Sequence, residues 1–331
     1  MKALITGIAG QDGTLLSQML IADGHEVVGL VKPGQSVETF IRYAPRAQLH
    51  ECDLGNPQQL EQLVIDVAPT EIYNLGGISS LVEAAENPEL THRINVGAVE
   101  AILAAMKTLA SRSRGTVHAT KFVQAASGTI FEGTEISPQD ERTPRCPITP
   151  YAIAKAQTLE LIDIARQQGL FAAAAILYNH ESPLRGEGFV TRRITQGVAK
   201  IAAGQQEYLE LGKLDVSRDW GWAPDYVRGM RAMLEVDTPH DYVLATGTSH
   251  ELTEFLALAF QAVGISDWQS VVRTNAEFHR HTDPTLLCGD SSRAYRELGW
   301  RHTKTFEEMT AAMVEYDRTL LDDPQALWHE H

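Results

Sequence analysis

The chain has 331 residues, 44% apolar and 21% charged, as in an ordinary soluble globular protein. A formal net charge of −15 argues against binding to nucleic acid or anionic membranes, and no apolar run approaches the ~18–20 residues of a membrane span. We therefore expect a cytoplasmic protein without a signal peptide. Cys52, Cys146 and Cys288 are widely spaced, which predicts reduced thiols and no metal site.

Short apolar runs alternate with helical patterns through the first half of the chain. We predict strands at residues 2–6, 26–31, 50–54, 71–76, 121–127 and 171–178, and helices at 12–24, 57–67, 93–110 and 151–168. Strands that alternate with helices of this length predict parallel βαβ units. The expected fold class is α/β, with a Rossmann-type doubly wound parallel sheet.

The pattern becomes less regular in the second half. We expect a loop at residues 180–189, a strand at 241–247, a helix at 305–321 and a frayed polar tail after Leu320. This change predicts a dinucleotide-binding domain at 1–178. It also predicts a smaller mixed α/β substrate lobe at 179–331, partly interleaved with the first domain. The crevice between the two is the expected ligand site.

A glycine-rich turn follows the first predicted strand and opens the first predicted helix. Residues 7–13 read GIAGQDG. Glycines at 7, 10 and 13 allow a tight turn and a close approach of the backbone to a pyrophosphate, which the helix N-terminus attracts. We therefore predict a nicotinamide dinucleotide site formed by Gly7, Gly10, Gln11, Asp12 and Gly13.

Ends of later strands can complete the same site. Asp53 and Leu54 follow the third strand, and Leu75 and Gly76 lie in NLGG, where small residues leave room for a cofactor. An acidic residue at the end of the second strand would hold a free ribose, and a basic one would meet a 2′-phosphate. Lys32 stands there with no acid beside it, which favours NADP(H) and leaves NAD(H) possible.

A Tyr-x-x-x-Lys pattern opens the last helix of the first half. The stretch YAIAK places Tyr151 and Lys155 on one helix face. We expect the ammonium to lower the pKa of the phenol, which could then exchange a proton with a sugar hydroxyl while hydride moves to the nicotinamide. Ser127, 24 positions earlier at a predicted strand end, could bind the same substrate oxygen. We assign all three as catalytic, and the Tyr and Lys also to the cofactor.

These motifs resemble the extended short-chain dehydrogenase/reductase superfamily. The stretches LITGIAGQDGTLL, ILYNHESPLRGEGFVTRRITQGVAKI, LGKLDVSRDWGWAPDYV and LLCGDSSRAYRELGW resemble GDP-mannose 4,6-dehydratases, over about the whole chain. The resemblance implies a GDP-hexose or GDP-heptose substrate and a homodimer or homotetramer. It implies that His180 contacts the cofactor and that the substrate meets Ser79, Asn179, Glu181, Val190, Arg192, Arg193, Arg218 and Arg280.

Arginine forks match phosphate oxygens, which agrees with a nucleotide diphosphate beside those arginines. Arg192 and Arg193 could instead be solvated residues of a helix. His180 and Glu181 could equally shape the loop that contains them, because no third ligand stands at metal-binding spacing.

The resemblance fails at one catalytic position. Dehydratases of this family carry a Glu two residues after the catalytic Ser or Thr, and this Glu takes the C5 proton. Thr129 stands at that position, and a hydroxyl is not a base near neutral pH. Glu132 and Glu135 lie further along the chain, where we expect their carboxylates to sit many ångströms away, so that replacement by either stays open but is not the expected interpretation. The stretch SGTIF resembles the Ser-x-Thr-x-Tyr of sugar-nucleotide 4-epimerases, with Phe131 in place of Tyr.

We therefore place a C4 epimerase first and count Thr129 among the catalytic residues. A reductase of GDP-4-keto sugars and a GDP-mannose 4,6-dehydratase with a non-standard base stay open. So does a non-catalytic protein that senses a nucleotide sugar or NADP(H), although a pure binder has no need of a tuned phenol.

Overall fold

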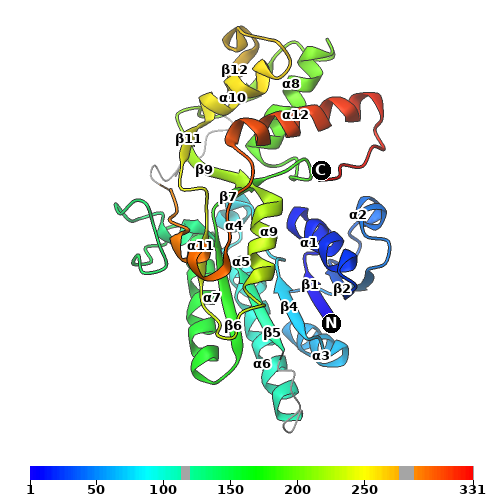
Figure 1. The fold of residues 1–331 in the computed structure, drawn as a ribbon, viewed down its shortest axis with the longest axis vertical. Helices are drawn as coiled ribbons and strands as arrows, with labels where there is room; N and C mark the ends of the chain where they lie inside the picture. The colour runs from blue at the N-terminus through cyan, green and yellow to red at the C-terminus, as the bar shows by residue number, and fades with distance from the viewer. Residues whose placement is uncertain (113–119, 276–286, 331) are drawn as a thin grey trace.

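The computed structural model describes residues 1–112, 120–275 and 287–330. Its main element is a seven-stranded parallel sheet with strand order β10-β6-β5-β4-β1-β2-β3 (Figure 1). The strands are β1 Lys2–Thr6, β2 Glu26–Val31, β3 Gln48–Glu51, β4 Glu71–Asn74, β5 Lys121–Ala125, β6 Phe171–Leu177 and β10 Tyr242–Leu244. The predicted Rossmann-type α/β class is confirmed.

Helices cover both faces of this sheet, as a doubly wound topology requires. One layer holds α1 Gln11–Ala22, α9 Ala223–Ala232 and α11 Ser292–Leu298, and the other holds α3 Pro57–Val67, α6 Gly97–Arg112 and α7 Pro150–Gln167 (Figure 1). Smaller helices connect these layers: α2 Glu38–Tyr43, α4 Leu81–Glu86, α5 Pro88–Asn95 and the 3₁₀ turn η1 Gly128–Phe131.

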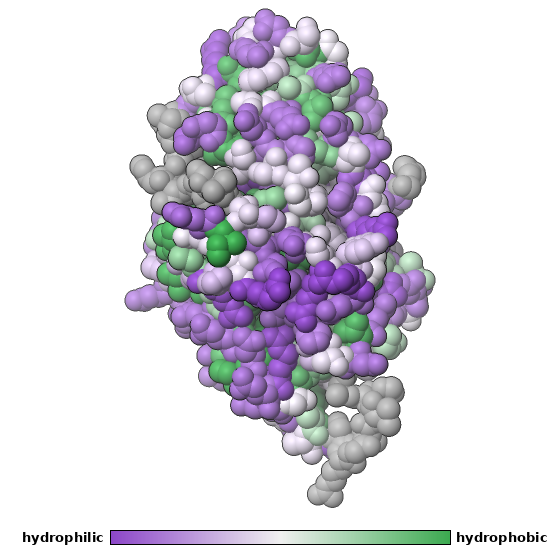
Figure 2. Space-filling model, turned by 60° about the vertical axis from the view of Figure 1, so that its left-hand side comes forward, coloured by the Kyte–Doolittle hydropathy of each residue, from purple (hydrophilic) through white to green (hydrophobic). Residues whose placement is uncertain are grey.

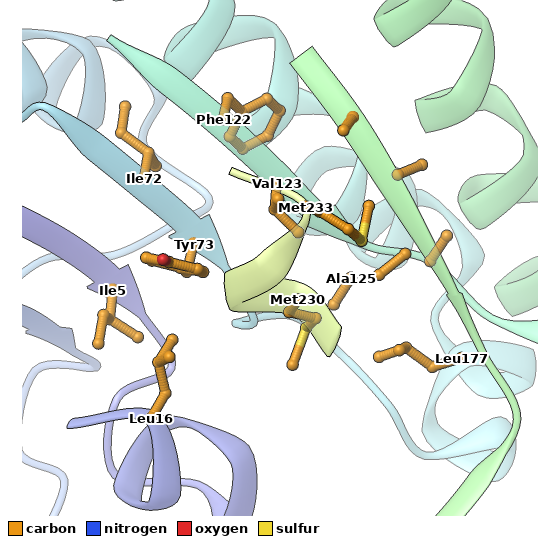
Figure 3. Packing of buried hydrophobic residues seen from close by; sticks show 14 of the residues in the cluster. Ile5, Leu16, Ile72, Tyr73, Phe122, Val123, Ala125, Leu177, Met230 and Met233 are labelled. Atoms are coloured by element: carbon orange, nitrogen blue, oxygen red, sulfur yellow. The ribbon is translucent and has the colours of Figure 1, made fainter. Parts of the chain in front are cut away.

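The first apolar core joins residues from both halves of the chain. Met230 of α9 and Met233, which follows the helix, are fully buried and lie over the central strands, near Tyr73 and Val123 (Figure 3). The strand β10 likewise comes from the second half of the chain and pairs with β6. The chain therefore returns to the first core after it has entered the second.

A second apolar core lies beyond the carboxyl edge of the large sheet. It packs between α8 Val190–Ala202, α10 Leu252–Gln261 and α12 Phe306–Asp322 (Figure 1). Two small sheets border this core. One consists of β7 Asn179–Glu181, β9 Ser217–Trp222 and β11 Ser249–Glu251. The other consists of β8 Leu209–Leu211 and β12 Val272–Thr274, and the 3₁₀ turn η2 Trp268–Val271 precedes β12. Trp220, Phe255 and Phe306 form its aromatic centre.

Three segments differ from the sequence-based expectations. His180 and Glu181 lie in a strand rather than a loop, because they pair with Gly221 and Trp222, about forty residues away. The helix predicted at 93–110 is divided between α5 and α6. The tail is docked rather than frayed: Trp328 packs edge-on against Trp222 at 5.4 Å, and the Trp222 indole N–H donates to Glu330 at 2.9 Å.

The surface is mainly hydrophilic on the face that Figure 2 shows, with apolar residues in small separate groups. Among the described residues, one helical stretch, Pro88–Arg112, is long and apolar enough to cross a membrane by length and composition. Half of its most apolar window is buried inside the protein, where α6 packs against α3 and α5 packs against α7. The fold therefore accounts for its apolar character.

Candidate active site

The glycine-rich turn forms a cradle that side chains could not enter. Gly7 has a φ of +65°, and a Cβ there would lie 2.7 Å from the Gly76 Cα. A Cβ on Gly13 would lie 2.5 Å from the Ile8 carbonyl oxygen. Gly10 is the N-cap of α1 and supplies no side-chain acceptor, so the first N–H groups of the helix are free of a side-chain cap. This arrangement fits a pyrophosphate.

Other predicted cofactor residues gather along the same carboxyl edge. The Gly76 N–H donates to Thr6 at 2.9 Å, which holds the ends of β4 and β1 together. Leu54 lies beside Gly76, since a Cβ on that glycine would approach the Leu54 side chain to 2.8 Å. Lys32 and Asp53 are exposed at the ends of β2 and β3. The geometry is compatible with the predicted adenosine end of a dinucleotide.

The turn after β4 is held from another helix. Asn95 is buried, accepts from the Ile78 N–H at 2.8 Å and donates to its carbonyl at 3.0 Å. The exposed Ser79, predicted to contact the substrate, and Leu75 lie on this turn. Asn95 therefore shapes the wall on which both residues sit.

The predicted catalytic residues meet where β5 ends and α7 begins. Ser127 follows β5 and caps the η1 turn, and Tyr151 stands in the first turn of α7, which packs against η1. Lys155 is buried, and its ammonium donates to the Ala125 carbonyl at 2.7 Å and lies 5.7 Å from the Tyr151 ring centroid. The structure therefore brings a hydroxyl, a phenol and an ammonium to the sheet edge that carries the glycine-rich turn.

The pKa of Tyr151 departs from expectation. Burial raises it, and the Ser127 hydrogen bond and the positive charge of Arg185 offset only part of that rise. Burial also lowers the pKa of Lys155 to about 8. The expected lowering of the phenol pKa by Lys155 is therefore wrong for this state of the protein. Arg185 is a site residue that the sequence reasoning missed, although it stands in the quoted stretch HESPLRGEGF.

The side chain at position 129 supports Ser127. The Thr129 hydroxyl donates to the Ser127 Oγ at 3.0 Å, and the Thr129 N–H donates to the same oxygen at 3.3 Å. The Glu132 carboxylate points to the start of α7 instead, where it accepts from the Ile148 N–H at 2.7 Å and from the Thr149 N–H. Glu132 is thus engaged in holding the catalytic helix.

A buried polar cluster of Asp12, His180, Glu181 and Arg185 lies between the cofactor turn and the substrate lobe. The His180 Nε2 lies 2.9 Å from the Asp12 carboxylate, and the Arg185 Nε lies 3.1 Å from that of Glu181. Glu181 also accepts from Thr191 at 2.7 Å. The cluster joins the predicted cofactor residues Asp12 and His180 to the predicted substrate residue Glu181.

Arg192 does not lie free for a phosphate. It is 5% exposed, its guanidinium lies 2.6 Å from the Asp317 carboxylate, and it faces the Tyr316 ring at 5.6 Å. It therefore joins α8 to α12, which corrects both its assignment to the substrate and the solvated-helix alternative. The sequence pattern could not show this, because Asp317 lies more than a hundred residues away.

The other residues predicted to contact the substrate lie on several elements of the second lobe. Arg193 lines an open pocket of about 530 Å³ between α8 and β8, together with Lys200 and Tyr208. Arg218 lies on β9 and donates to the Ser217 carbonyl at 2.7 Å. Asn179 begins β7 and Val190 begins α8. Arg280 lies outside the described residues.

In the part of the chain that the structure describes, no group of three or more His, Cys, Asp or Glu side chains is arranged to hold an ion. Cys52, Cys146 and Cys288 are free thiols.

The Arg192–Asp317 pair gives a stability prediction. We expect Arg192→Met to lower the free energy of unfolding by about 3–5 kcal/mol, because it leaves Asp317 buried without its partner. Arg192→Met/Asp317→Leu should recover most of that loss, since it removes both charges. Chemical denaturation followed by tryptophan fluorescence measures the effect, with Arg193→Met on the adjacent, half-buried position as the control. Equal stability of the single variant and the wild type would contradict the structural role.

Comparison with known proteins decides the family. The model of the GDP-mannose 4,6 dehydratase family matches residues 4–313. The chain belongs to this family. A GDP-mannose 4,6-dehydratase from Sinorhizobium fredii is 37% identical over 345 residues, which cover 96% of this chain and 97% of that protein. This membership identifies the chain as an enzyme of an NAD(P)-dependent nucleotide-sugar family.

Solved structures confirm the fold of this family member. A UDP-glucose 4-epimerase from Thermotoga maritima superposes with a TM-score of 0.83 at 23% identity, covering 97% of this chain and all of that one. A dTDP-glucose 4,6-dehydratase from Bacillus anthracis, crystallised with NAD, superposes with a TM-score of 0.81 at 16% identity. The match covers 98% of this chain and all of that one. Epimerases and dehydratases share the fold, so the fold does not choose between them. The sequence relatives favour the dehydratase alternative over the C4 epimerase placed first above.

Proposed function

We propose that this enzyme uses NADP(H) to oxidise C4 of a GDP-linked hexose. The observation that carries the proposal is the grouping of Ser127, Tyr151 and the buried Lys155 ammonium at the sheet edge that holds the glycine-rich turn. When bound, the nicotinamide would accept the C4 hydride and later return it. Tyr151 exchanges a proton with the C4 hydroxyl and Ser127 orients that oxygen, while the Lys155 ammonium is held at the Ala125 carbonyl beside the Tyr151 ring.

The second lobe offers a candidate site for the GDP group. The open pocket between α8 and β8 carries the cations Arg193 and Lys200, which suit phosphates, beside the carboxylates of Glu207 and Glu210. The relatives named as GDP-mannose dehydratases favour a guanine nucleotide. Heptoses remain within the proposed substrate class, because pocket volume at C5 and C6 sets that choice.

Dehydration is the first outcome to test after C4 oxidation, because it is the reaction in the relatives' names. It removes the C5 proton and the C6 hydroxyl as water and returns the hydride to C6. A second outcome returns the hydride to C4, as in a 4-epimerase or a 4-ketoreductase. The Thr129 hydroxyl favours this return of the hydride to C4. It hydrogen-bonds Ser127 at the position where a dehydratase carries its catalytic carboxylate.

The remaining assignments rest on exposed features. Lys32 at the end of β2 favours NADP(H) over NAD(H). Ile153 and Ile164 of α7 are 42% and 49% exposed, and their spacing puts them on one helix face that could pack against a second copy in a homodimer or tetramer. The free cysteines are compatible with the cytoplasm.

Incubation with GDP-mannose and NADP⁺ tests the function. A GDP-4-keto-6-deoxy sugar, identified by chromatography and mass spectrometry, would establish dehydration. A product of unchanged mass with an inverted C4 would establish epimerisation, and dependence on NADPH with a 4-keto sugar would establish a reductase. Absence of all three products, with GDP-mannose and with GDP-heptoses, would contradict the proposal.

A further inference from the structure

A histidine–carboxylate pair lies directly behind the cofactor turn. Asp12 occupies the first turn of α1, and its carboxylate meets the His180 Nε2 at 2.9 Å. The other ring nitrogen, Nδ1, lies 2.7 Å from the Tyr178 carbonyl, which has no proton to give, so Nδ1 must donate. With Nε2 donating to Asp12, the ring carries both protons and a positive charge.

The backbone and a neighbouring glutamine hold the pair in place. Gln11 donates to the His180 carbonyl at 3.1 Å, and its own oxygen accepts from Ser182 at 2.8 Å. The imidazole stacks on the Tyr226 ring at 4.7 Å. Both members are largely buried, with His180 7% exposed, so the contact is a fixed part of the fold.

The charges around the pair nearly cancel only when His180 is protonated. Asp12 and Glu181 supply two carboxylates, and Arg185 supplies one cation. The imidazole also packs on the Tyr226 ring of α9 and meets the carbonyl of Tyr178, the residue after β6, and neither group carries a charge. A neutral His180 would leave one excess negative charge at the helix end that suits a pyrophosphate, where it would repel phosphate oxygens.

We propose that His180 is a positioning residue that neutralises Asp12 beneath the dinucleotide turn, so that tight dinucleotide binding requires a proton on His180. The proposal rests on the cofactor assignment made above and adds a residue-level requirement to it. Asp12 raises the pKa of His180 in opposition to burial, and His180 lowers that of Asp12, both of which agree with an imidazolium–carboxylate pair.

The sign of the pH effect follows from linkage. Bound phosphates add negative charge, so they favour the protonated ring and raise its pKa in the complex. Affinity is then highest below the pKa of the free protein, falls as pH rises through the two pKa values, and levels off above both. If bound dinucleotide raises the pKa of His180 by one unit, its affinity above both pKa values is about tenfold lower than its affinity below them.

Binding of NADPH to the purified protein tests the proposal without any sugar substrate. Dissociation constants are measured by calorimetry from about pH 6 to about pH 9, across the range in which histidine titrates. The wild type should lose about tenfold more affinity over this range than Asp12→Asn, which keeps an acceptor for His180 but removes the charge. The His180→Asn variant should bind NADPH weakly at every pH. Its NADPH affinity should change with pH as that of Asp12→Asn does.

The chain offers a matched control at the opposite edge of the sheet. His25 and Glu71 form another buried pair, with 3.8 Å between the His25 Nδ1 and the carboxylate. His25→Asn should alter stability while keeping the pH dependence of the wild type. Thermal melts at each pH confirm that all variants are folded.

The outcomes separate the two proposals. Parallel curves for the wild type, Asp12→Asn and His180→Asn would overturn the role of His180 and leave the proposed function intact. Failure of the folded wild type to bind either NADPH or NADH would overturn both.

Discussion

Tyr151→Phe is expected to lower the turnover of GDP-mannose about 10²–10⁴-fold, the usual contribution of a positioned proton donor or acceptor. The substitution keeps the ring beside Lys155 and removes only the phenol oxygen. NADPH affinity should fall far less than turnover, by under about tenfold, because Tyr151 is one of the predicted cofactor residues while the glycine-rich turn is untouched. Product formation is followed by chromatography, and binding by calorimetry.

The exposed Tyr295 provides the control. Tyr295→Phe removes a phenol that is 48% exposed on α11, away from Ser127 and Lys155, and should turn over at the wild-type rate. Retention of more than about half of the activity by Tyr151→Phe would mean that the phenol is not the proton carrier.

Thr129→Glu is expected to create or raise dehydration of GDP-mannose at least about tenfold, because it places a carboxylate where the family carries its C5 base. Thr129 is half-buried beside Ser127, so the longer side chain has access to the crevice. The measured quantity is the rate of GDP-4-keto-6-deoxy sugar formation. Thr134→Glu, on the same loop outside the Ser127 contact, should leave that rate unchanged.

A second substitution distinguishes two consequences of having Thr at position 129: its hydrogen bond to Ser127 and the lack of a base for the C5 proton. Thr129→Val keeps the shape and removes the hydrogen bond to Ser127, so C4 oxidation should slow about tenfold. The contrary result is a wild type that dehydrates GDP-mannose at a rate that is the same in Thr129→Val and in Thr129→Glu. Such a result would show that another side chain removes the C5 proton. In that case the dehydratase outcome holds and the argument from position 129 fails.

Local patterns in the sequence were sufficient for the fold class and for much of the site. The βαβ alternation, the glycines at 7, 10 and 13 and the Tyr-x-x-x-Lys spacing each act within a few residues, so their consequences can be derived from the chain alone. The parallel sheet then brings strand ends to one edge whatever the details of packing. Ser127 and Tyr151 lie at that edge, and their catalytic roles stay predictions.

Pairings over long sequence distances were decided only by the tertiary structure. Arg192 and Arg193 are adjacent in sequence, yet one is buried against Asp317 and the other lines an open pocket. Residues 180–181 form a strand only because β9 lies beside them. Asp12 pairs with His180, and Arg185 acts on Tyr151, because the second lobe folds back onto the first. Such contacts depend on which surfaces pack against each other in the folded chain. The sequence around each residue does not indicate its distant partner.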